Sequence, residues 1–281
     1  MQKTDNFFLI HNYNTVPTDL TEYCENYIIY DCSDKDGVRD ELKAKGLKYI
    51  EIPNTGHNIT SYFNYFIDNY DSLPEVIDLL KGNIIGRHLT KEYFDKVYGN
   101  TYFTYLYENK GDRKGRVKST DPDEKEDEIS FLINDNIFCE KNTSWYVQSP
   151  DHPHWYFDDF DDLLRFIYKD PVVPRWNIFA PGACYIVRRA QILKNTPEFY
   201  ANLNKLMNYD RNPNFPSEAH QVERLLPTIF NSSYEVNPWM NDEDAFDEKL
   251  KERRELMLKK EEWNSKRLKR LRKLLGQKPP V

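Results

Sequence analysis

The chain of 281 residues is 39% hydrophobic and 30% charged, which is the composition of a globular protein and not of a disordered or fibrous one. It contains no run of about 18 apolar residues that would predict a membrane-spanning helix, and its first residues lack the layout of a secretory signal. The charge is unevenly divided, with a net charge of +9 on residues 249–281 and −16 on the remainder. A nucleic-acid-binding body is therefore not expected, whereas the basic end of the chain is suited to anionic partners.

The cysteines and the aromatic residues indicate which metals and ligands the protein is expected to bind. The four cysteines lie in apolar segments without metal-finger spacing, which predicts free thiols, a reducing, cytoplasmic location and no zinc site. Aromatic residues make up 15% of the chain. This excess fits either half-buried tyrosines in the core or a ligand, such as a sugar or a base, that stacks on rings.

Strand-like and helical runs alternate along the first third of the sequence. The predicted strands are 7–11, 27–30, 48–52 and 76–80, and the predicted helices between them include 38–45 and 59–70. This order predicts an α/β fold with a mostly parallel sheet flanked by helices on both faces. The polar turns 31–37, 54–58 and 81–83 each follow a strand, so they are expected to meet at one cleft.

The rest of the chain is predicted to be less regular. We expect strands at 102–107 and 129–133, with an acidic loop between them, and helices at about 189–208 and 217–230. From Asn241 onward charged residues dominate, which predicts one long helix. The resulting division is a body over residues 1–240 and a basic helical extension over 241–281.

Four motifs in order resemble those of GT-A glycosyltransferases, a nucleotide-sugar-dependent fold family. The segment Tyr30–Gly37 resembles the family's Asp-x-x-Ser-x-Asp-Gly turn, and Pro53–Asn58 resembles the Asn-x-Gly stretch that borders the donor site. Phe179–Val187 is similar to the acceptor-side Gly-Ala strand, and Ser217 to Arg224 to the helix start that carries the catalytic base. The order and spacing of the motifs carry the resemblance, which covers roughly residues 6–232.

The chain also resembles an uncharacterised domain family, in three further segments. These are Asn54 to Tyr62, Asn69 to Pro74, and Glu223-Arg224 through Phe230. The resemblance adds no known activity, and it supports the same boundaries for the body of the protein.

The resemblance to GT-A enzymes implies a role for each of the following residues. The residues implied to bind the donor nucleotide are Asp31, Asp34, Asn54 and His57, and those implied to bind its diphosphate are Lys81, Asn83 and Arg87. The residues implied to bind the acceptor are Trp155, Asp158, Asp159 and His220. Glu218 is implied to be the general base. The implied reaction moves a sugar from a nucleotide-diphosphate donor to a hydroxyl of a glycan, with inversion. GT-A enzymes usually hold a divalent cation with Asp-x-Asp, whereas this chain has Lys81-Gly82-Asn83 at that place. A turn without carboxylates is a poor site for a hard cation, so we expect transfer without a metal.

Simpler explanations stay open for several of these residues. Asp31 and Asp34 also fit helix caps, and Glu218 also fits an acid in the first turn of a helix. The pair Glu223-Arg224 is interpreted as a structural ion pair. The segment around His152, His154 and Trp155 fits an acceptor pocket, a metal site or a surface loop. The alternative function is a non-catalytic glycan- or nucleotide-binding protein.

Leucines recur at helical spacing among the basic residues of the extension, at Leu268, Leu271 and Leu275. A basic amphipathic helix is typical of a segment that lies on an anionic membrane surface. The same pattern fits a helix that packs back on the acidic body. Both interpretations stay open at this point.

Overall fold

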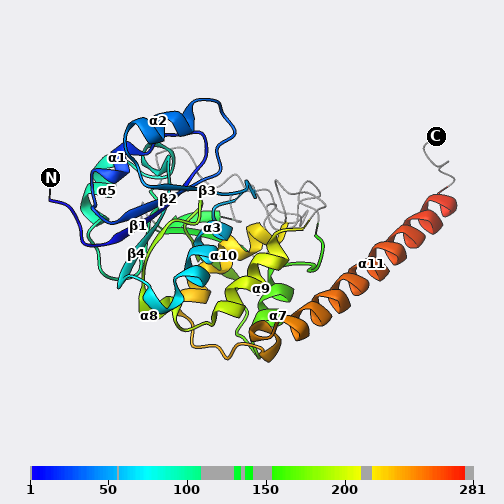
Figure 1. Cartoon of the computed structure of the whole chain (residues 1–281). Helices are drawn as coiled ribbons and strands as arrows, with labels where there is room; N and C mark the ends of the chain where they lie inside the picture. Colours follow the sequence, from blue (N-terminus) through cyan, green and yellow to red (C-terminus); the bar gives the residue numbers. More distant parts are fainter. Residues whose placement is uncertain are drawn as a thin grey trace.

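A computed structural model describes residues 2–55, 57–108, 130–133, 137–141, 154–209 and 217–275 of the chain (Figure 1). Two sheets lie among these residues, one of six strands in the order β3-β2-β1-β4-β9-β5 and one of three strands in the order β6-β7-β8. The six strands are β1 (Phe7–Asn12), β2 (Tyr27–Asp31), β3 (Tyr49–Glu51), β4 (Val76–Lys81), β5 (Thr104–Tyr105) and β9 (Tyr185–Arg188). The other three are β6 (Ser130–Ile133), β7 (Ile137–Lys141) and β8 (Trp176–Phe179).

The first four strands of the large sheet are parallel, as the sequence predicts. Strand β9 runs antiparallel between β4 and β5. The mainly parallel sheet flanked by helices confirms the predicted α/β class. Strand β5 is shorter than the predicted strand 102–107, and the predicted acidic loop lies outside the described residues.

Helices cover both faces of this sheet because the central strands alternate apolar side chains between two cores. Phe8 and Ile10 of β1 enter one core with α1 (Thr18–Thr21), α2 (Val38–Ala44) and α5 (Lys91–Val97). Leu9 points into the other core, which α3 (Ile59–Asp68), α9 (Pro197–Met207) and α10 (Ser217–Asn231) complete. Burial on both faces explains the almost continuous apolar runs of these strands.

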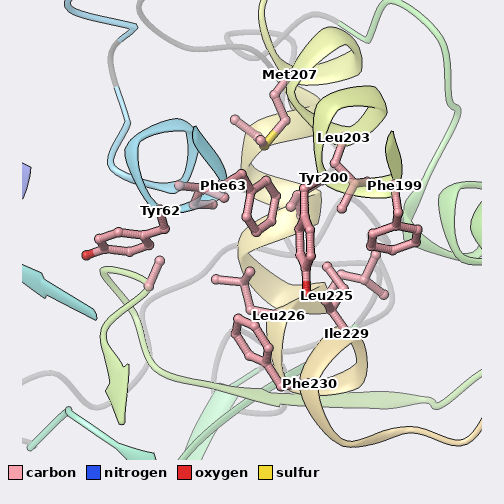
Figure 2. Packing of buried hydrophobic residues seen from close by; sticks show 14 of the residues in the cluster. Tyr62, Phe63, Phe199, Tyr200, Leu203, Met207, Leu225, Leu226, Ile229 and Phe230 are labelled. Atoms are coloured by element: carbon pink, nitrogen blue, oxygen red, sulfur yellow. The ribbon is translucent and has the colours of Figure 1, made fainter. Parts of the chain in front are cut away.

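The second core is built around the aromatic ring of Tyr200 on α9 (Figure 2). Its ring centroid lies 5.1 Å from that of Phe63 and 5.3 Å from that of Phe66, both on α3. The Tyr200 hydroxyl donates to the carbonyl of Ile192 at 2.8 Å, so this buried polar atom has a partner. Packing of α3 against α9 holds the N-terminal end of α3 at the edge of the sheet, where the candidate site lies.

The predicted helix at 189–208 is wrong in one respect, because the structure divides it in two. Four residues, 193–196, separate the end of α8 (Arg189–Ile192) from the start of α9. Thr196 caps α9 by accepting from the backbone N–H of Phe199, and Pro197 occupies the first helical position. Both are signals for a new helix start within the predicted one.

The remaining described elements are short connections and the C-terminal helix. They are η1 (Tyr70–Ser72), α4 (Ile84–Arg87), α7 (Phe160–Ile167), η3 (Pro238–Asn241) and α11 (Glu243–Leu274). The first turns of α11 are part of the body, since Phe246 and Leu250 are buried in the second core. The core therefore continues past residue 240. None of the described helices combines the length and the apolar composition that crossing a membrane requires.

Candidate functional site

A pocket of about 510 Å³ opens at the carboxyl ends of the parallel strands. Its lining residues follow β1, β2, β3 and β4 in turn, and they are His11, Tyr13, Asp34, Asn54, His57, Asn58, Lys81, Gly82, Asn83 and Arg87. The chain reverses its direction of winding between β1 and β4, which are neighbours in the sheet. In open parallel sheets ligands bind at this point. We call this hollow the strand-end pocket.

Gly82 allows the turn after β4 to lie against the end of β1. A Cβ atom at this position would stand 2.7 Å from Thr15 Oγ1 and closer still to the side chain of Asn12. The backbone N–H of Gly82 donates to the carbonyl of His11 at 2.8 Å. This close approach places Lys81 and Asn83 on the pocket wall, where the sequence predicted a diphosphate site.

Lys81 and Arg87 are the cationic side chains of the pocket. Lys81 is partly buried and Arg87 is exposed, and among the described residues neither forms an ion pair with a carboxylate. Lys81 acts on the two neighbouring histidines. Burial and the charge of Lys81 lower the pKa of His57 to about 4, and burial, Lys81 and His57 together lower the pKa of His11 to about 3. Both rings are therefore neutral at pH 7, and the positive charge rests on Lys81 and Arg87.

The opposite rim of the pocket carries Asp34 and Tyr13. The Tyr13 hydroxyl donates to Asp34 Oδ2 at 2.9 Å, and Asn14 Nδ2 donates to Asp34 Oδ1 at 2.8 Å. These two hydrogen bonds lower the pKa of Asp34. The ring of Tyr13 is 44% exposed, so a flat ligand has an aromatic surface available beside a fixed carboxylate.

Asp31 does not line the pocket, although the sequence assigned it to the nucleotide. Its side chain is fully buried and accepts from Asn12 Nδ2 at 2.7 Å, Ser33 Oγ at 2.6 Å and Arg39 Nε at 3.0 Å. Four lone-pair positions of the carboxylate are largely occupied by these donors. The hydrogen bond from Asn12 to Asp31 thus connects the end of β1 to the end of β2. Asp34, and not Asp31, is the aspartate that lines the pocket.

The loop between β8 and β9 is joined to the pocket wall by a hydrogen bond, although none of its residues lines the pocket. Asn58, which lines the pocket, donates from Nδ2 to the carbonyl of Gly182 at 3.0 Å. Gly182 has φ +99, and a Cβ atom there would stand 2.7 Å from the ring of His88. The backbone N–H of Gly182 donates to Glu223 Oε1 at 2.7 Å. Only glycine combines this backbone conformation with so close an approach.

Glu223 lies beside this loop with a partly exposed side chain. Its second oxygen pairs with Arg224 Nη1 at 3.1 Å, and the side chain remains 19% exposed. Arg224 is buried, with Nε 2.6 Å from Glu140 Oε2 and its guanidinium 4.6 Å from the centre of the Phe179 ring. The ion pair predicted between Glu223 and Arg224 is thus present. Glu223 is also the carboxylate that faces the Asn58–Gly182 contact.

The sequence proposed Glu218 as the general base, and its surroundings do not suit that role. The side chain is fully buried. Oε1 accepts the backbone N–H groups of Trp155 at 2.9 Å and Tyr156 at 2.7 Å, and Oε2 accepts the Tyr209 hydroxyl at 2.7 Å. A carboxylate that is fully buried cannot reach a dissolved acceptor. Glu218 holds the 155–156 backbone in place.

The residues predicted to bind the acceptor lie away from the strand-end pocket, none of them among its lining residues. Trp155 stacks on Tyr209 with ring centroids 5.4 Å apart, and the Arg254 guanidinium of α11 lies 3.6 Å from the centre of the other face of the ring. Asp158 pairs with Lys260 of α11. Asp159 caps α7 by accepting from the backbone N–H of Asp162 at 2.8 Å.

These contacts show that the segment seats the C-terminal helix. Arg253 of α11 pairs with Asp162, and its Nε donates to the carbonyl of Tyr156 at 3.2 Å. We call Trp155, Tyr156, Asp158 and Asp162 the tail-docking surface. The backbone carbonyl of His220, two residues after Glu218 on α10, accepts from Arg224 Nη1 at 2.9 Å. His152, which the sequence grouped with His154 as one alternative for a metal site, lies outside the described residues.

The pocket residues that sequence reasoning missed are His11 and Tyr13, whereas Asn58 belongs to the turn 54–58 that was expected at the cleft. His11 and Tyr13 stand at the end of a strand that otherwise resembles core, and Asn58 meets Gly182 across 124 positions of the chain. Among the described residues no group of three or more His, Cys, Asp or Glu side chains is arranged to hold a metal ion. Comparison of the chain with protein-family models, with curated proteins and with solved structures finds no match.

Proposed function

We propose that this chain is a glycosyltransferase whose strand-end pocket takes a nucleotide-diphosphate sugar. The observation that carries the proposal is the pair of cations Lys81 and Arg87 at the carboxyl ends of parallel strands, next to two neutral histidines. A diphosphate supplies the negative charge that such a pair attracts. The N-terminal end of α3 adds the positive end of a helix dipole at His57 and Asn58.

The rim of the pocket supports a nucleotide as the rest of the donor. The exposed ring of Tyr13 offers a stacking surface for a base or ribose, and the Asp34 carboxylate beside it accepts hydroxyl or amide donors. Asn54 lies on the same wall. These polar groups distinguish a nucleotide from a free phosphate, which would use the cations alone.

In the proposed reaction the bond between the sugar C1 atom and the donor phosphate oxygen breaks, and its electron pair leaves with the diphosphate. Lys81 and Arg87 stabilise that developing charge in place of a divalent cation. An acceptor hydroxyl forms the new bond to C1 from the opposite face and loses its proton to a carboxylate. Since Glu218 is buried, we assign this proton to Glu223, the carboxylate at the Gly182 loop.

The proposal is tested by thermal shift and calorimetric titration with uridine, guanosine, adenosine, cytidine and thymidine diphosphates, each with EDTA and with Mn²⁺. One base is expected to stabilise the protein in EDTA, because a ligand that binds only the folded chain raises its stability. The Lys81→Met variant should bind that nucleotide about 10–100-fold more weakly, from the loss of one charge-assisted contact. Lys91→Met is the matched control, since Lys91 pairs with Asp95 and lies over the Tyr23 ring, and it does not line the strand-end pocket.

Turnover distinguishes the two candidate functions that share this pocket. Release of free sugar or transfer to a glycan in EDTA supports the enzyme. Binding without turnover over a broad panel of nucleotide-sugars supports the non-catalytic nucleotide-binding alternative. Binding that requires Mn²⁺, or affinity that is equal in the Lys81 and Lys91 variants, would overturn the assignment of the diphosphate to this pocket.

A further inference from the structure

Helix α11 consists of two segments that differ in charge and in their contacts with the body. The proximal segment, 243–262, has eight acidic and six basic residues, whereas the distal segment, 263–275, has six basic residues and no acidic one. The proximal segment lies along the body near α7 and α9, and the distal segment projects away from it (Figure 1). The two halves therefore do not serve the same purpose.

The proximal segment is held by specific contacts. Leu250 and Met257 are buried, Arg254 covers the Trp155 ring, and Lys260 pairs with Asp158. This arrangement fulfils the expectation of a helix that packs back on the acidic body, but only as far as the region of Trp263.

The distal segment exposes large apolar side chains. Trp263 is 61% exposed, Leu268 51%, Leu271 43% and Leu275 70%. Leu268, Leu271 and Leu275 share one face of the helix because they recur at spacings of three and four. The helical spacing places Lys266 and Arg270 on the opposite side of the helix. An exposed apolar stripe with a basic opposite face is the pattern of a helix that lies in a lipid–water interface.

We propose that the distal segment of α11 binds the surface of an anionic lipid membrane, independently of the function of the strand-end pocket. The six positive charges of the distal segment, of which only Lys266 has an ion-pair partner among the described residues, Glu262, complement an anionic surface, and the leucine stripe enters the lipid–water interface. A nucleic acid would use the charges and leave the leucines in water.

The size of the segment argues against a second copy of the chain as the occupant. A helix of 13 residues is about 20 Å long and about 10 Å wide, so one face covers roughly 200 Å². Stable protein interfaces bury about 800 Å² from each partner. A lipid surface has no such requirement, since each inserted side chain contributes separately.

The projection of the helix also solves an electrostatic difficulty. Residues 1–248 carry a net charge of −16 and would be repelled by an anionic surface. The segment beyond the last docked residues, 265–275, extends for about 16 Å. This length exceeds the Debye length of about 8 Å at physiological salt, so the tip can reach the membrane while the body remains screened.

The test is co-sedimentation of the full-length protein with sucrose-loaded vesicles of phosphatidylcholine, with and without phosphatidylserine. The protein should pellet with the anionic vesicles at low salt and be released at high salt. The variant Leu268→Gln/Leu271→Gln/Leu275→Gln should partition at least about tenfold less, because burial of each leucine contributes a tenfold factor or more. The matched control is Leu256→Gln/Leu258→Gln, which changes leucines of similar exposure, 39% and 47%, on the proximal segment, and it should bind as the wild type does.

A charge variant, Lys266→Gln/Arg267→Gln/Arg270→Gln, should reduce binding about fivefold for each cation removed. Analytical ultracentrifugation of the same proteins without lipid examines the rival occupant. The proposal is overturned if the wild type ignores anionic vesicles at low salt, or if the leucine variant pellets as the wild type does. It is also overturned if the wild type is a dimer that the leucine variant converts to a monomer.

Discussion

The strand-end pocket and the tail-docking surface are both rich in charged and aromatic side chains, but they differ in how those side chains are paired. In the pocket, Lys81 and Arg87 have no carboxylate partner among the described residues. On the tail-docking surface, Asp158 and Asp162 each pair with a cation of α11, and Trp155 lies between two flat groups. The two regions have similar compositions, so composition alone makes both of them candidate ligand sites. Ion pairing distinguishes them: charged side chains without a protein partner indicate a ligand site, whereas charged side chains paired with α11 form a structural joint, meaning a contact that holds the helix on the body.

The first prediction concerns the tail-docking surface and the stability that is lost when the helix docked on it is removed. Removal of residues 249–281 deletes the buried Leu250 and Met257 together with Arg254. Loss of one large buried side chain costs about 2–5 kcal/mol, so this truncation should destabilise the protein by about 5 kcal/mol or leave it unfolded. Removal of 265–281 should change the free energy of unfolding in urea by less than about 1 kcal/mol. Equal losses in the two truncations would show that the tail-docking surface is not a joint.

The second prediction separates the two glutamates of α10. Glu223→Gln keeps an oxygen that can accept from Gly182 and should lower kcat by about 10²–10⁴-fold with donor affinity preserved. Glu218→Gln introduces an amide where three donors converge and should instead lower stability by about 1–3 kcal/mol. Rates of transfer and urea denaturation of both variants measure the contrast. If Glu223→Gln kept the wild-type kcat and pH profile, Glu223 would not be the base, and its role would be to position the Gly182 loop.

The contrast between these glutamates also marks what could be predicted from the sequence. The alternation of apolar runs and polar turns was sufficient for the parallel sheet and for the convergence of Asp34, Asn54 and Lys81, because parallel strands end at one edge. An acidic residue in the first turn of a helix has the same local pattern whether it is buried or exposed. Only the packing of α10 against the 155–156 backbone shows that Glu218 is inside.

The misassigned acceptor residues have a similar physical cause. The aromatic and acidic run from Trp155 to Asp159 has the composition of a sugar-binding wall, since stacking and hydrogen bonding use the same residue types for a ligand and for a helix. Its partner here is Arg254, which is 99 positions away in the sequence. Conversely, Tyr13 and His11 border the pocket because β1 ends there, and no local pattern distinguishes a strand-end histidine from one in the core.

The third prediction concerns the pH dependence of stability that arises from His57 in the strand-end pocket. The folded protein holds the pKa of His57 at about 4 instead of 6.5, first through burial and then through Lys81. The unfolded chain therefore binds a proton between pH 6.5 and pH 4 that the folded chain does not, and stability falls as the pH decreases through this window. At pH 5 the loss relative to pH 8 is about 2 kcal/mol for this residue.

Comparison of the wild type with His57→Asn by urea denaturation at pH 8 and pH 5 isolates this contribution. The variant should lose about 2 kcal/mol less than the wild type over that interval. A nucleoside diphosphate bound beside Lys81 would offset the charge that lowers the pKa, so saturating ligand should also reduce the loss in the wild type. Identical profiles for the two proteins would show that burial and Lys81 together do not lower the pKa of His57 in the folded protein.

The last prediction, a small change in the free energy of unfolding, concerns Arg254, the cation that covers the Trp155 ring. Arg254 both stacks on the ring and donates from Nη1 to the Trp155 carbonyl at 3.1 Å. Arg254→Lys keeps the charge but loses the flat guanidinium, and it should lower the free energy of unfolding by about 0.5–1 kcal/mol. Lys251→Gln, at an exposed position of the same helix, is the control and should be neutral. Neither variant should alter nucleotide affinity, because neither residue lines the strand-end pocket. A loss of nucleotide affinity in Arg254→Lys would mean that the two regions are coupled, and α11 would then have to be treated as part of the functional site.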